Sequence, residues 1–217
     1  FAWGYNVEGA LGDGTTDAAR APVPLTTLQG VMVRAVACGA GTEEHHSVAL
    51  TEQGRVYAWG SGRSGQLGHG DTQSLVLPRI IAGLDGRVVA RVACGSAHTL
   101  ALEEGGALWS WGWGHFGQLG HGAGAGAGNV TAPARVVALQ GVVVARIACG
   151  SAHSTAATDA GAVFTWGWGV NGQLGHGDAA SLPAPAAVKA LQGVHVSFVA
   201  CGLAHTVAPP SLSASLC

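Results

Sequence analysis

The hydrophobic residues of this chain fall in short runs that glycine or proline separates from one another. One kind of run is rich in valine and alanine and ends in Cys-Gly, as at 142–150, and another carries a tryptophan, as at 55–60. Short β-branched and aromatic runs between Gly and Pro residues are typical of β-strands. No long run has the 3.6-residue period of an amphipathic helix. The pattern therefore predicts an all-β fold.

Two sequence markers recur along the chain with one common period. A Trp-Gly pair begins at residues 3, 59, 111 and 166, and a Cys-Gly pair begins at residues 38, 94, 149 and 201. Successive pairs are 52 to 56 residues apart, and self-similarity at such a period indicates a repeat architecture. The expected division is four repeats and a non-repeat tail: 1–54, 55–106, 107–161, 162–208 and 209–217.

Each repeat contains about four extended segments. A Trp segment is followed by a glycine loop, a proline segment, a β-branched run and a second short run, and a glycine turn leads to the next Trp segment. Four short strands in about fifty residues match one β-propeller blade. A single four-stranded sheet cannot bury both of its faces, so such blades stack against their neighbours around an axis.

Some residues recur at the same place in successive repeats, and this recurrence favours a structural role for them. The repeat signature comprises Trp59, Gly60, Gly65, Leu67, Gly68, Trp111, Gly112, Gly117, Leu119, Gly120, Trp166, Gly167, Gly172, Leu174 and Gly175, together with Cys94, His98, Cys149, His153, Cys201 and His205.

This signature resembles the regulator of chromosome condensation repeat. The resemblance rests on Trp-Gly-x-Gly-x-x-Gly-Gln-Leu-Gly-His-Gly and on a later Val-Ala-Cys-Gly-Ser-Ala-His-Thr-Leu-Ala-Leu; it is close at 59–102, 111–157 and 166–208. It is weaker at 3–50, where the glycine loop differs and 41–44 lengthen the turn before His46. The resemblance implies a seven-bladed β-propeller with four-stranded blades. Four repeats correspond to about four of seven blades, so we expect a fragment that forms an incomplete or open ring with exposed blade faces.

The charge of the chain excludes some classes of function. The formal net charge is −2 and only 10% of residues are charged, whereas 48% are hydrophobic. Disorder of the charged type is excluded because the chain has ample apolar surface to bury. A protein that coats nucleic acid would need a basic surface, so no direct nucleic-acid partner is expected. No apolar stretch is long enough for a membrane-spanning helix, and we expect a cytoplasmic or nuclear location.

The glycine loops match Gly-x-Gly-x-x-Gly three times, beginning at Gly60, Gly112 and Gly167. A dinucleotide site needs this motif between a strand and a helix, with an acidic residue about twenty positions later. The sequence predicts no helix after these loops, so we expect no cofactor and assign the glycines to loop geometry. In the first repeat Asn6 replaces the middle glycine, and we expect a positive φ there because asparagine tolerates it.

The recurring cysteines and histidines raise the question of a metal site. A structural zinc site needs four converging ligands, whereas each repeat supplies one cysteine and one histidine that a ring would distribute around its axis. We therefore expect no metal, and we expect each histidine to bond backbone at the start of a strand. Disulfides are not expected either, unless the cysteines line a very narrow channel. Reduced cysteines favour an intracellular protein, and Cys217 has no assignable role.

No catalytic residue is predicted. His69, His121 and His176 end the glycine loops, and Asp13 stands at that place in the first repeat. An imidazole and a carboxylate are interchangeable as turn-stabilising hydrogen-bond partners but not as a catalytic base. No paired carboxylates or Ser/His/Asp set stands apart from the repeat. The chain is therefore expected not to be an enzyme, and no small-molecule substrate is predicted.

Two further features bear on binding. Trp113 and Trp168 stand two residues after signature tryptophans, and we expect them to pack between blades, with exposed partner anchors as the alternative. The family also includes a plant ultraviolet-B photoreceptor, whose light-absorbing tryptophans would correspond to Ala40, Ser96, Ser151 and Leu203. Because these four residues are not tryptophan, photoreception of that type is not expected.

The alternating Gly-Ala tract at 122–128 is interpreted as a surface loop.

The resemblance implies three functions. The favoured one is a non-catalytic scaffold that presents loops to a protein partner. The second is a guanine-nucleotide exchange factor for a small Ras-like GTPase, the activity of the founding member of the family. The third is a repeat module within a larger protein of the ubiquitin-ligase type.

Overall fold

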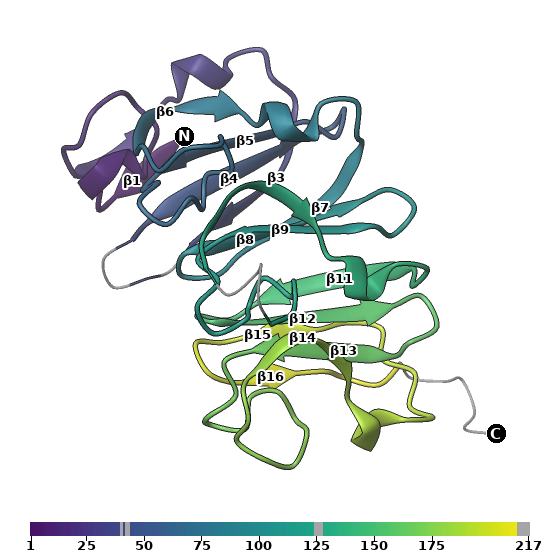
Figure 1. Ribbon diagram of the computed structural model, residues 1–217. Helices are drawn as coiled ribbons and strands as arrows, with labels where there is room; N and C mark the ends of the chain where they lie inside the picture. The colour runs from purple at the N-terminus through teal and green to yellow at the C-terminus, as the bar shows by residue number, and fades with distance from the viewer. Residues whose placement is uncertain (40, 42–43, 124–127, 212–217) are drawn as a thin grey trace.

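The protein is described by a computed structural model that covers residues 1–39, 41, 44–123 and 128–211 (Figure 1). Ala40, the centre of the Gly-Ala tract at 124–127 and Cys217 lie outside the described residues. The described chain forms β-strands and five short 3-10 turns, of which η1 is Val7–Gly9, η2 Thr26–Leu28, η3 Ala82–Leu84, η4 Val137–Leu139 and η5 Lys189–Leu191.

Within the described residues, three sheets have four antiparallel strands each. Blade A contains β3 (Val33–Cys38), β4 (His46–Thr51), β5 (Val56–Gly60) and β6 (Leu75–Ile80). Blade B contains β7 (Val89–Cys94), β8 (His98–Glu103), β9 (Leu108–Gly112) and β10 (Val130–Arg135). Blade C contains β11 (Val144–Cys149), β12 (His153–Thr158), β13 (Val163–Gly167) and β14 (Leu182–Ala187).

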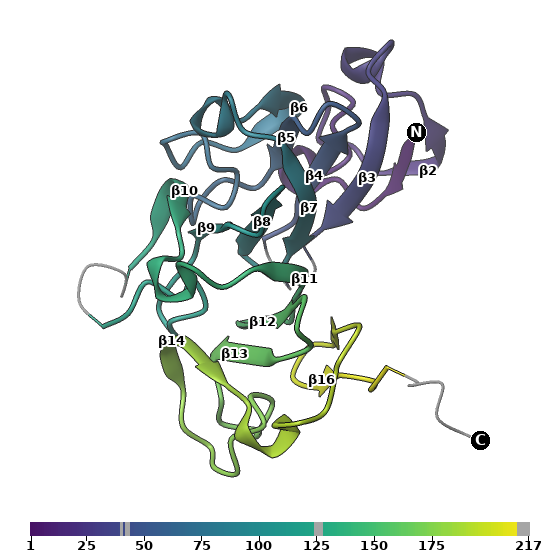
Figure 2. The ribbon, with the colours of Figure 1, turned by 90° about the vertical axis from the view of Figure 1, so that its right-hand side faces the viewer.

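Two two-stranded sheets stand before and after these blades. The amino half-blade consists of β1 (Ala2–Gly4) and β2 (Ala19–Val23), and the carboxyl half-blade consists of β15 (Ala200–Cys201) and β16 (Thr206–Val207). Figure 1 shows the five sheets one after another, with the half-blades at opposite ends. Figure 2 shows that they follow an arc that does not close. The predicted all-β propeller of the regulator-of-chromosome-condensation type, as an open ring, is confirmed.

The first strands of blades A, B and C and of the carboxyl half-blade lie nearest the axis of the arc, where β3, β7, β11 and β15 are neighbours. Each blade takes its first two strands from one sequence repeat and its last two from the next. The boundary expected at 54/55 falls between β4 and β5, and those at 106/107 and 161/162 fall at the same place in blades B and C. Every blade therefore ties two successive repeats together through its central pair of strands.

The hydrophobic core is divided into layers between neighbouring blades. The first layer joins Val48 and Leu50 of blade A to Val89 and Trp111 of blade B. The second joins Leu100 of blade B to blade C, where Trp166 takes the position of Trp111, and a smaller third layer joins blade C to the carboxyl half-blade. Each blade thus buries its faces only against its neighbours, as expected for a repeat protein.

One backbone prediction is wrong. Asn6 has φ −134° rather than a positive value. Its side chain fixes the loop instead, because Nδ2 donates to the carbonyl of Asp17 at 3.0 Å and Oδ1 accepts from the amide of Leu11 at 2.8 Å. The side-chain hydrogen bonds of Asn6 therefore shape this turn, and the tolerance of asparagine for a positive φ plays no part in it.

Candidate functional site

A series of hydrogen bonds connects each blade to the next at the centre of the molecule. His46 Nε2 lies 3.0 Å from Thr99 Oγ1, His98 Nε2 lies 3.0 Å from Ser154 Oγ, and His153 Nε2 lies 3.0 Å from Thr206 Oγ1. In each pair the hydroxyl belongs to the blade that follows the histidine. The expectation that these histidines bond backbone at the start of a strand is therefore wrong, because their partner is a side chain more than fifty residues away.

Each of these hydroxyl groups also donates a hydrogen bond to a carbonyl in the glycine loop of the preceding blade. Thr99 Oγ1 donates to the carbonyl of Gln66 at 2.9 Å, and Trp111 Nε1 donates to the same oxygen at 2.8 Å. Ser154 and Trp166 share the carbonyl of Gln118 in the same way. Histidine, hydroxyl and tryptophan of the signature thus act together to attach neighbouring blades, and the side chains of Thr99, Trp111, Ser154 and Trp166 are buried.

The glycine of each Cys-Gly pair lies where the inner strands converge. A Cβ at Gly95 would overlap the ring of His98 and meet the carbonyl oxygen of Gly150 in the next blade. The backbone of the turns is also bonded from blade to blade, since Ser96 N donates to Ser151 O at 3.1 Å and Ser151 N donates to Leu203 O at 3.0 Å. Glycine is therefore needed for the close approach of successive turns.

These turns line a depression of about 330 Å³ at the axis. Its lining includes Cys38, Cys94, Cys149 and Cys201, so the cysteines of successive blades gather at one place as in a narrow channel. All four are free thiols. Burial raises the pKa of the Cys94, Cys149 and Cys201 thiols above the ordinary value, and a raised pKa makes a thiol less reactive.

The described residues contain no group of three or more His, Cys, Asp or Glu side chains placed to hold a metal ion. Burial in an apolar environment lowers the pKa of His46 to about 4, of His98 to about 3 and of His153 to about 4. At neutral pH these imidazoles are therefore uncharged, and each can bond the hydroxyl group of the next blade without the cost of burying a cation.

An aromatic patch lies on the same face as these turns, on the loops that follow β9 and β13. It consists of Trp113, His115, Phe116 and Trp168. The ring centroids of Trp113 and Phe116 are 5.1 Å apart in an edge-on arrangement, and those of Phe116 and Trp168 are 5.9 Å apart. The patch therefore spans blades B and C. Phe116 is 41% exposed, and both tryptophans are half-buried.

Backbone bonds hold the patch beside the central turns. Trp113 N donates to Ala97 O at 2.7 Å, and Trp168 N donates to Ala152 O at 2.8 Å. The side chains lie at the surface, where they contact Phe116, and so they are placed as partner anchors would be. The sequence predicts packing between blades for these tryptophans, and the contact of Trp168 in blade C with Phe116 in blade B is of that kind, although it lies at the surface and not in the core.

A buried glutamine lies at the base of each of these loops. Gln118 Oε1 accepts from Phe116 N at 3.0 Å, and Gln173 Oε1 accepts from Asn171 N at 2.9 Å. Their Nε2 groups are buried and have no hydrogen-bond partner within the described part of the chain. In blade A the equivalent Gln66 Nε2 donates to Glu44 Oε2 at 2.7 Å. A carboxylate in blade A therefore accepts the hydrogen bond for which the amides of Gln118 and Gln173 have no acceptor among the described residues.

The other loop residues that the sequence singled out stay within their own blades. His121 Nε2 lies 3.0 Å from Ser110 Oγ, His176 Nε2 lies 2.9 Å from Thr165 Oγ1, and His69 Nε2 lies 3.3 Å from Ala58 O. Each of these bonds joins the end of a glycine loop to the tryptophan strand. No helix of the described chain follows Gly60, Gly112 or Gly167.

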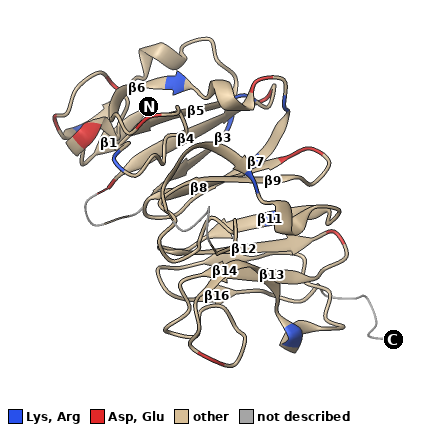
Figure 3. Cartoon of the chain, viewed as in Figure 1, with Lys and Arg blue, Asp and Glu red and all other residues tan. Residues whose placement is uncertain are grey.

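Charged residues are sparse in the part of the chain that carries the aromatic patch, and Figure 3 marks few of them after β9. From residue 105 on, the charged residues are Arg135, Arg146, Asp159, Asp178 and Lys189. The described residues contain no helix long and apolar enough to cross a membrane.

The model of the regulator of chromosome condensation (RCC1) repeat matches the chain four times, at 1–50, 53–102, 105–157 and 160–208. The chain belongs to this repeat family. It is 36% identical over 208 residues to the ultraviolet-B receptor UVR8 of Arabidopsis thaliana, with 96% of this chain and 46% of that protein covered. It is 38% identical over 209 residues to the human E3 ubiquitin-protein ligase HERC2, with 95% of this chain and 4% of that protein covered.

Solved structures of other proteins share the fold. Human WBSCR16 superimposes with a TM-score of 0.80 at 28% identity, over 95% of this chain and 52% of its own. Prp20p from Saccharomyces cerevisiae superimposes with a TM-score of 0.71 at 26% identity, over 81% of this chain and 43% of its own. The chain thus spans about half the length of the plant relative and of WBSCR16, and a small part of HERC2.

The structure also locates three of the four residues that were expected at the places of the light-absorbing tryptophans. Ser96 and Ser151 lie in the central turns with their hydroxyl oxygens 2.8 Å apart, and Leu203 is exposed at the end of the arc. The fourth position, Ala40, lies outside the described residues.

Proposed function

We propose that this chain is a non-catalytic scaffold that binds a protein partner through the aromatic patch. Membership of the RCC1 repeat family supports the general class, and the patch supports the location. The single observation that carries the proposal is the continuous aromatic surface from Trp113 over Phe116 to Trp168, which crosses from blade B to blade C. Exposed aromatic residues of this kind act as anchors in protein interfaces.

The buried glutamines indicate which partner chemistry the patch fits. Among the described residues their amide groups have no acceptor, and an unpaired buried donor costs about 1–3 kcal/mol. Glu44 provides the acceptor for Gln66 within the chain. A suitable partner would place an acidic side chain over Gln118 or Gln173 and an apolar or aromatic side chain against the patch. The carboxylate would accept the hydrogen bond of the glutamine amide, and the second side chain would pack on the aromatic rings. We therefore propose an acidic and aromatic peptide segment as the recognised element.

A display selection with a random peptide library tests this proposal. Wild-type chain is the bait, and a variant with Trp113→Ala and Trp168→Ala is the matched bait without the patch. A second control is Val137→Ser, which changes an exposed residue on η4. We expect wild type and Val137→Ser to enrich peptides with Asp or Glu next to an aromatic residue, and the double variant not to do so.

Affinity measurements on one enriched peptide complete the test. Loss of an anchoring tryptophan costs about 2 kcal/mol or more, so the Kd of the double variant should rise by at least about 30-fold. The variant should keep the circular dichroism spectrum of wild type and should unfold cooperatively, because the patch lies outside the core layers between the blades. Equal peptide affinity for wild type and the double variant would refute the patch as the binding surface.

A second candidate is guanine-nucleotide exchange on a small Ras-like GTPase. The observation that favours it is the likeness to Prp20p, whose crystal structure is described with its binding properties to Gsp1p and histones. Release of fluorescent nucleotide from a panel of small GTPases tests it. Acceleration well above the spontaneous rate supports exchange, and an unchanged rate with every GTPase in the panel argues against it.

A third candidate is a repeat module within a larger ligase, as the likeness to HERC2 suggests. In that case the chain would supply partner recognition and another region the chemistry. Sequencing of the complete transcript tests this candidate, since a ligase domain in the same reading frame would support it and a complete reading frame without such a domain before or after residues 1–217 would exclude it.

A further inference from the structure

An arginine stands on the innermost strand of each complete blade. Arg34 lies in β3, Arg91 in β7 and Arg146 in β11. Arg91 and Arg146 stand three residues before the cysteine of the Cys-Gly pair, and Arg34 stands four residues before it. These strands are neighbours at the axis of the arc. The three arginines, here called the arginine row, are therefore brought side by side in the first half of each strand, away from the central turns and the aromatic patch.

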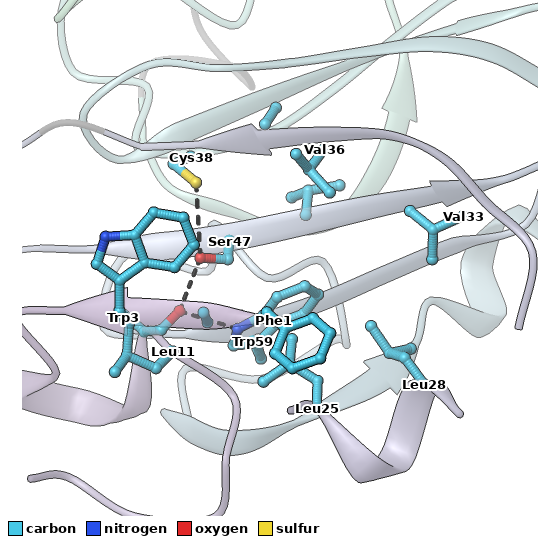
Figure 4. Close-up of a pocket in the computed structure, with 14 residues that line it drawn as sticks. Phe1, Trp3, Leu11, Leu25, Leu28, Val33, Val36, Cys38, Ser47 and Trp59 are labelled. Atoms are coloured by element: carbon cyan, nitrogen blue, oxygen red, sulfur yellow. Dashed lines mark hydrogen bonds between the residues drawn. The ribbon is translucent and has the colours of Figure 1, made fainter. Parts of the chain in front are cut away.

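The two sides of β3 differ, and the arginine lies on the side of the following blade. Val36 and Cys38 line an apolar hollow of about 420 Å³ between β3 and the amino half-blade (Figure 4). Arg34 extends to the other side, where its Nη2 donates to Val89 O at 3.2 Å and to Ala90 O at 2.7 Å. Both carbonyls belong to β7, so the arginine of blade A lies against the inner strand of blade B.

The alternation of side chains along a strand directs the other two arginines in the same way. In β7, Val92 packs in the layer shared with blade A, whereas Ala93 packs in the layer shared with blade C. Arg91 stands two residues before Ala93 and is therefore on the side of blade C. In β11, Ala148 packs in the layer shared with the carboxyl half-blade, and Arg146 stands two residues before it. Each arginine is thus directed toward the sheet that follows its own.

A β-bulge interrupts each inner strand beside its arginine. The register of pairing shifts between residues 33 and 35 in β3, between 89 and 91 in β7 and between 144 and 146 in β11. Bulges leave backbone groups unpaired and change the direction of a side chain. The freed carbonyls are used by the row, since Ala90 O accepts from Arg34 and Ala145 O accepts from Arg146 Nη1 at 2.9 Å. The bulges therefore hold arginine side chains at the inner edge of the blades.

The positive charges of the row have no carboxylate partner. The ion pairs of the described chain involve other arginines. Burial and then the charges of Arg146 and Arg34 lower the pKa of Arg91, so the three guanidinium groups are close enough to repel one another. Glu104 and Asp159 are exposed in the turns after β8 and β12 and form no ion pair with the row. A bound anion would relieve this repulsion.

Most of the guanidinium donors are also free to bind a ligand. A guanidinium group has several N–H donors, of which Arg34 uses Nη2 and Arg146 uses Nη1 for backbone carbonyls. The side chain of Arg91, in the middle of the row, forms no hydrogen bond with the described residues. The row therefore combines charge without a counterion and donors without acceptors.

We propose that the arginine row binds a short chain of phosphate groups, such as a triphosphate, at the axis of the arc. Guanidinium groups pair with phosphate oxygens two at a time, and three positive charges match a ligand that carries several negative charges. Because the arginines come from three successive blades, we expect a chain of phosphates to contact all three and a single phosphate to contact two at most. The site is separate from the aromatic patch and does not depend on the proposed partner.

A small phosphate ligand suits this place better than an acidic peptide does. Each carboxylate of a peptide brings one charge, and its side chain loses rotamer freedom when it is ordered. A phosphate chain carries more charge on fewer rotatable bonds. The row also lies where the blades converge on the axis, so a compact ligand reaches it more readily than a folded partner.

Isothermal titration calorimetry of the purified chain with sodium triphosphate, at neutral pH and without divalent cations, tests the proposal. We expect a Kd below about 1 mM. Arg91→Gln removes the guanidinium group in the middle of the row and should weaken binding by about 10-fold or more. Arg91→Lys keeps the charge without the planar fork and should lie between wild type and Arg91→Gln. Arg135→Gln, at an exposed arginine of the outer strand β10, is the matched control and should bind as wild type does.

Two further ligands test what the row recognises. Orthophosphate contacts fewer arginines, so its Kd should be at least about 10-fold higher than that of triphosphate. A hexaglutamate peptide should likewise bind at least about 10-fold more weakly. Equal affinity for orthophosphate would overturn the assignment to a phosphate chain, and equal affinity for hexaglutamate would overturn the choice of phosphate over an acidic peptide.

NMR of the arginine Nε–H groups locates the bound ligand. Triphosphate should shift the signals of Arg34, Arg91 and Arg146 and leave that of Arg135 in place. The proposal is overturned if triphosphate at about 10 times the expected Kd produces neither heat nor a shift of these signals. It is also overturned if Arg91→Gln binds as wild type does, or if Arg135→Gln loses as much affinity as Arg91→Gln.

Discussion

Acidification should destabilise this protein through the buried histidines that join its blades. His46, His98 and His153 have pKa values of about 4, 3 and 4, below the ordinary value of 6.5, because burial disfavours the charged imidazole. In the unfolded chain each would bind a proton near pH 6.5. The unfolded state therefore takes up more protons as pH falls, so the stability that is present above pH 6.5 is lost progressively below it.

The magnitude follows from this linkage. A histidine that stays neutral in the folded state and has a pKa near 6.5 in the unfolded state lowers the free energy of unfolding by about 1.2 kcal/mol between pH 7 and pH 5.5. Three such histidines together lower it by about 4 kcal/mol. Burial also lowers the pKa of His69 and His121, and these two residues add to the effect in the same direction.

Urea unfolding at pH 7.0, 6.0 and 5.5 and constant ionic strength, followed by tryptophan fluorescence, measures this loss. His98→Asn removes one titrating group, so the loss between pH 7 and pH 5.5 should fall by about 1.2 kcal/mol whatever the stability of the variant at pH 7. Val137→Asn changes an exposed residue on η4 that does not titrate, so it is the control and should leave the pH dependence as in wild type. An identical pH dependence in wild type and His98→Asn would refute the reasoning.

Other changes probe the contacts between blades. Trp111→Phe removes the bond to Gln66 O and buried ring volume, so urea unfolding should show a loss of about 2–3 kcal/mol. Trp3→Phe changes a tryptophan that is 62% exposed and should change stability by less than about 0.5 kcal/mol; equal losses for the two variants would contradict the burial difference. Gly150→Ala places a methyl group against the His153 ring and the Gly202 carbonyl and should cost more than about 4 kcal/mol or prevent folding. Gly128→Ala, where a Cβ meets nothing within 4 Å, is its control and should leave the thermal midpoint unchanged.

The sequence predicted the fold because its markers are local and periodic. Trp-Gly and Cys-Gly pairs recur at one spacing, and each strand is bounded by residues that stop it. The open arc was also predictable, since four repeats are fewer than the blades that the resemblance implies. The half-repeat offset of the blades was not, because no local feature of the sequence shows that β4 pairs with β5 of the next repeat.

The contacts between blades could not be predicted because they join distant residues. The histidine of Cys-Gly-Ser-Ala-His bonds a hydroxyl more than fifty residues later, and a single sequence contains no signal for that distance. One signal was present but unused: Ser or Thr directly follows the histidine in all four repeats, as at Ser47, Thr99, Ser154 and Thr206. The unpaired amides of Gln118 and Gln173 likewise depend on what the fold leaves around them, since Gln66 has the same motif and a partner.

Hydrogen exchange of the chain with and without a selected peptide tests the proposed binding surface most directly. The account predicts protection of backbone amides in the loops around Phe116 and Asn171, with little change at η4 or in the amino half-blade. Protection confined to the amino half-blade, or to the side of the arc away from the aromatic patch, would contradict it.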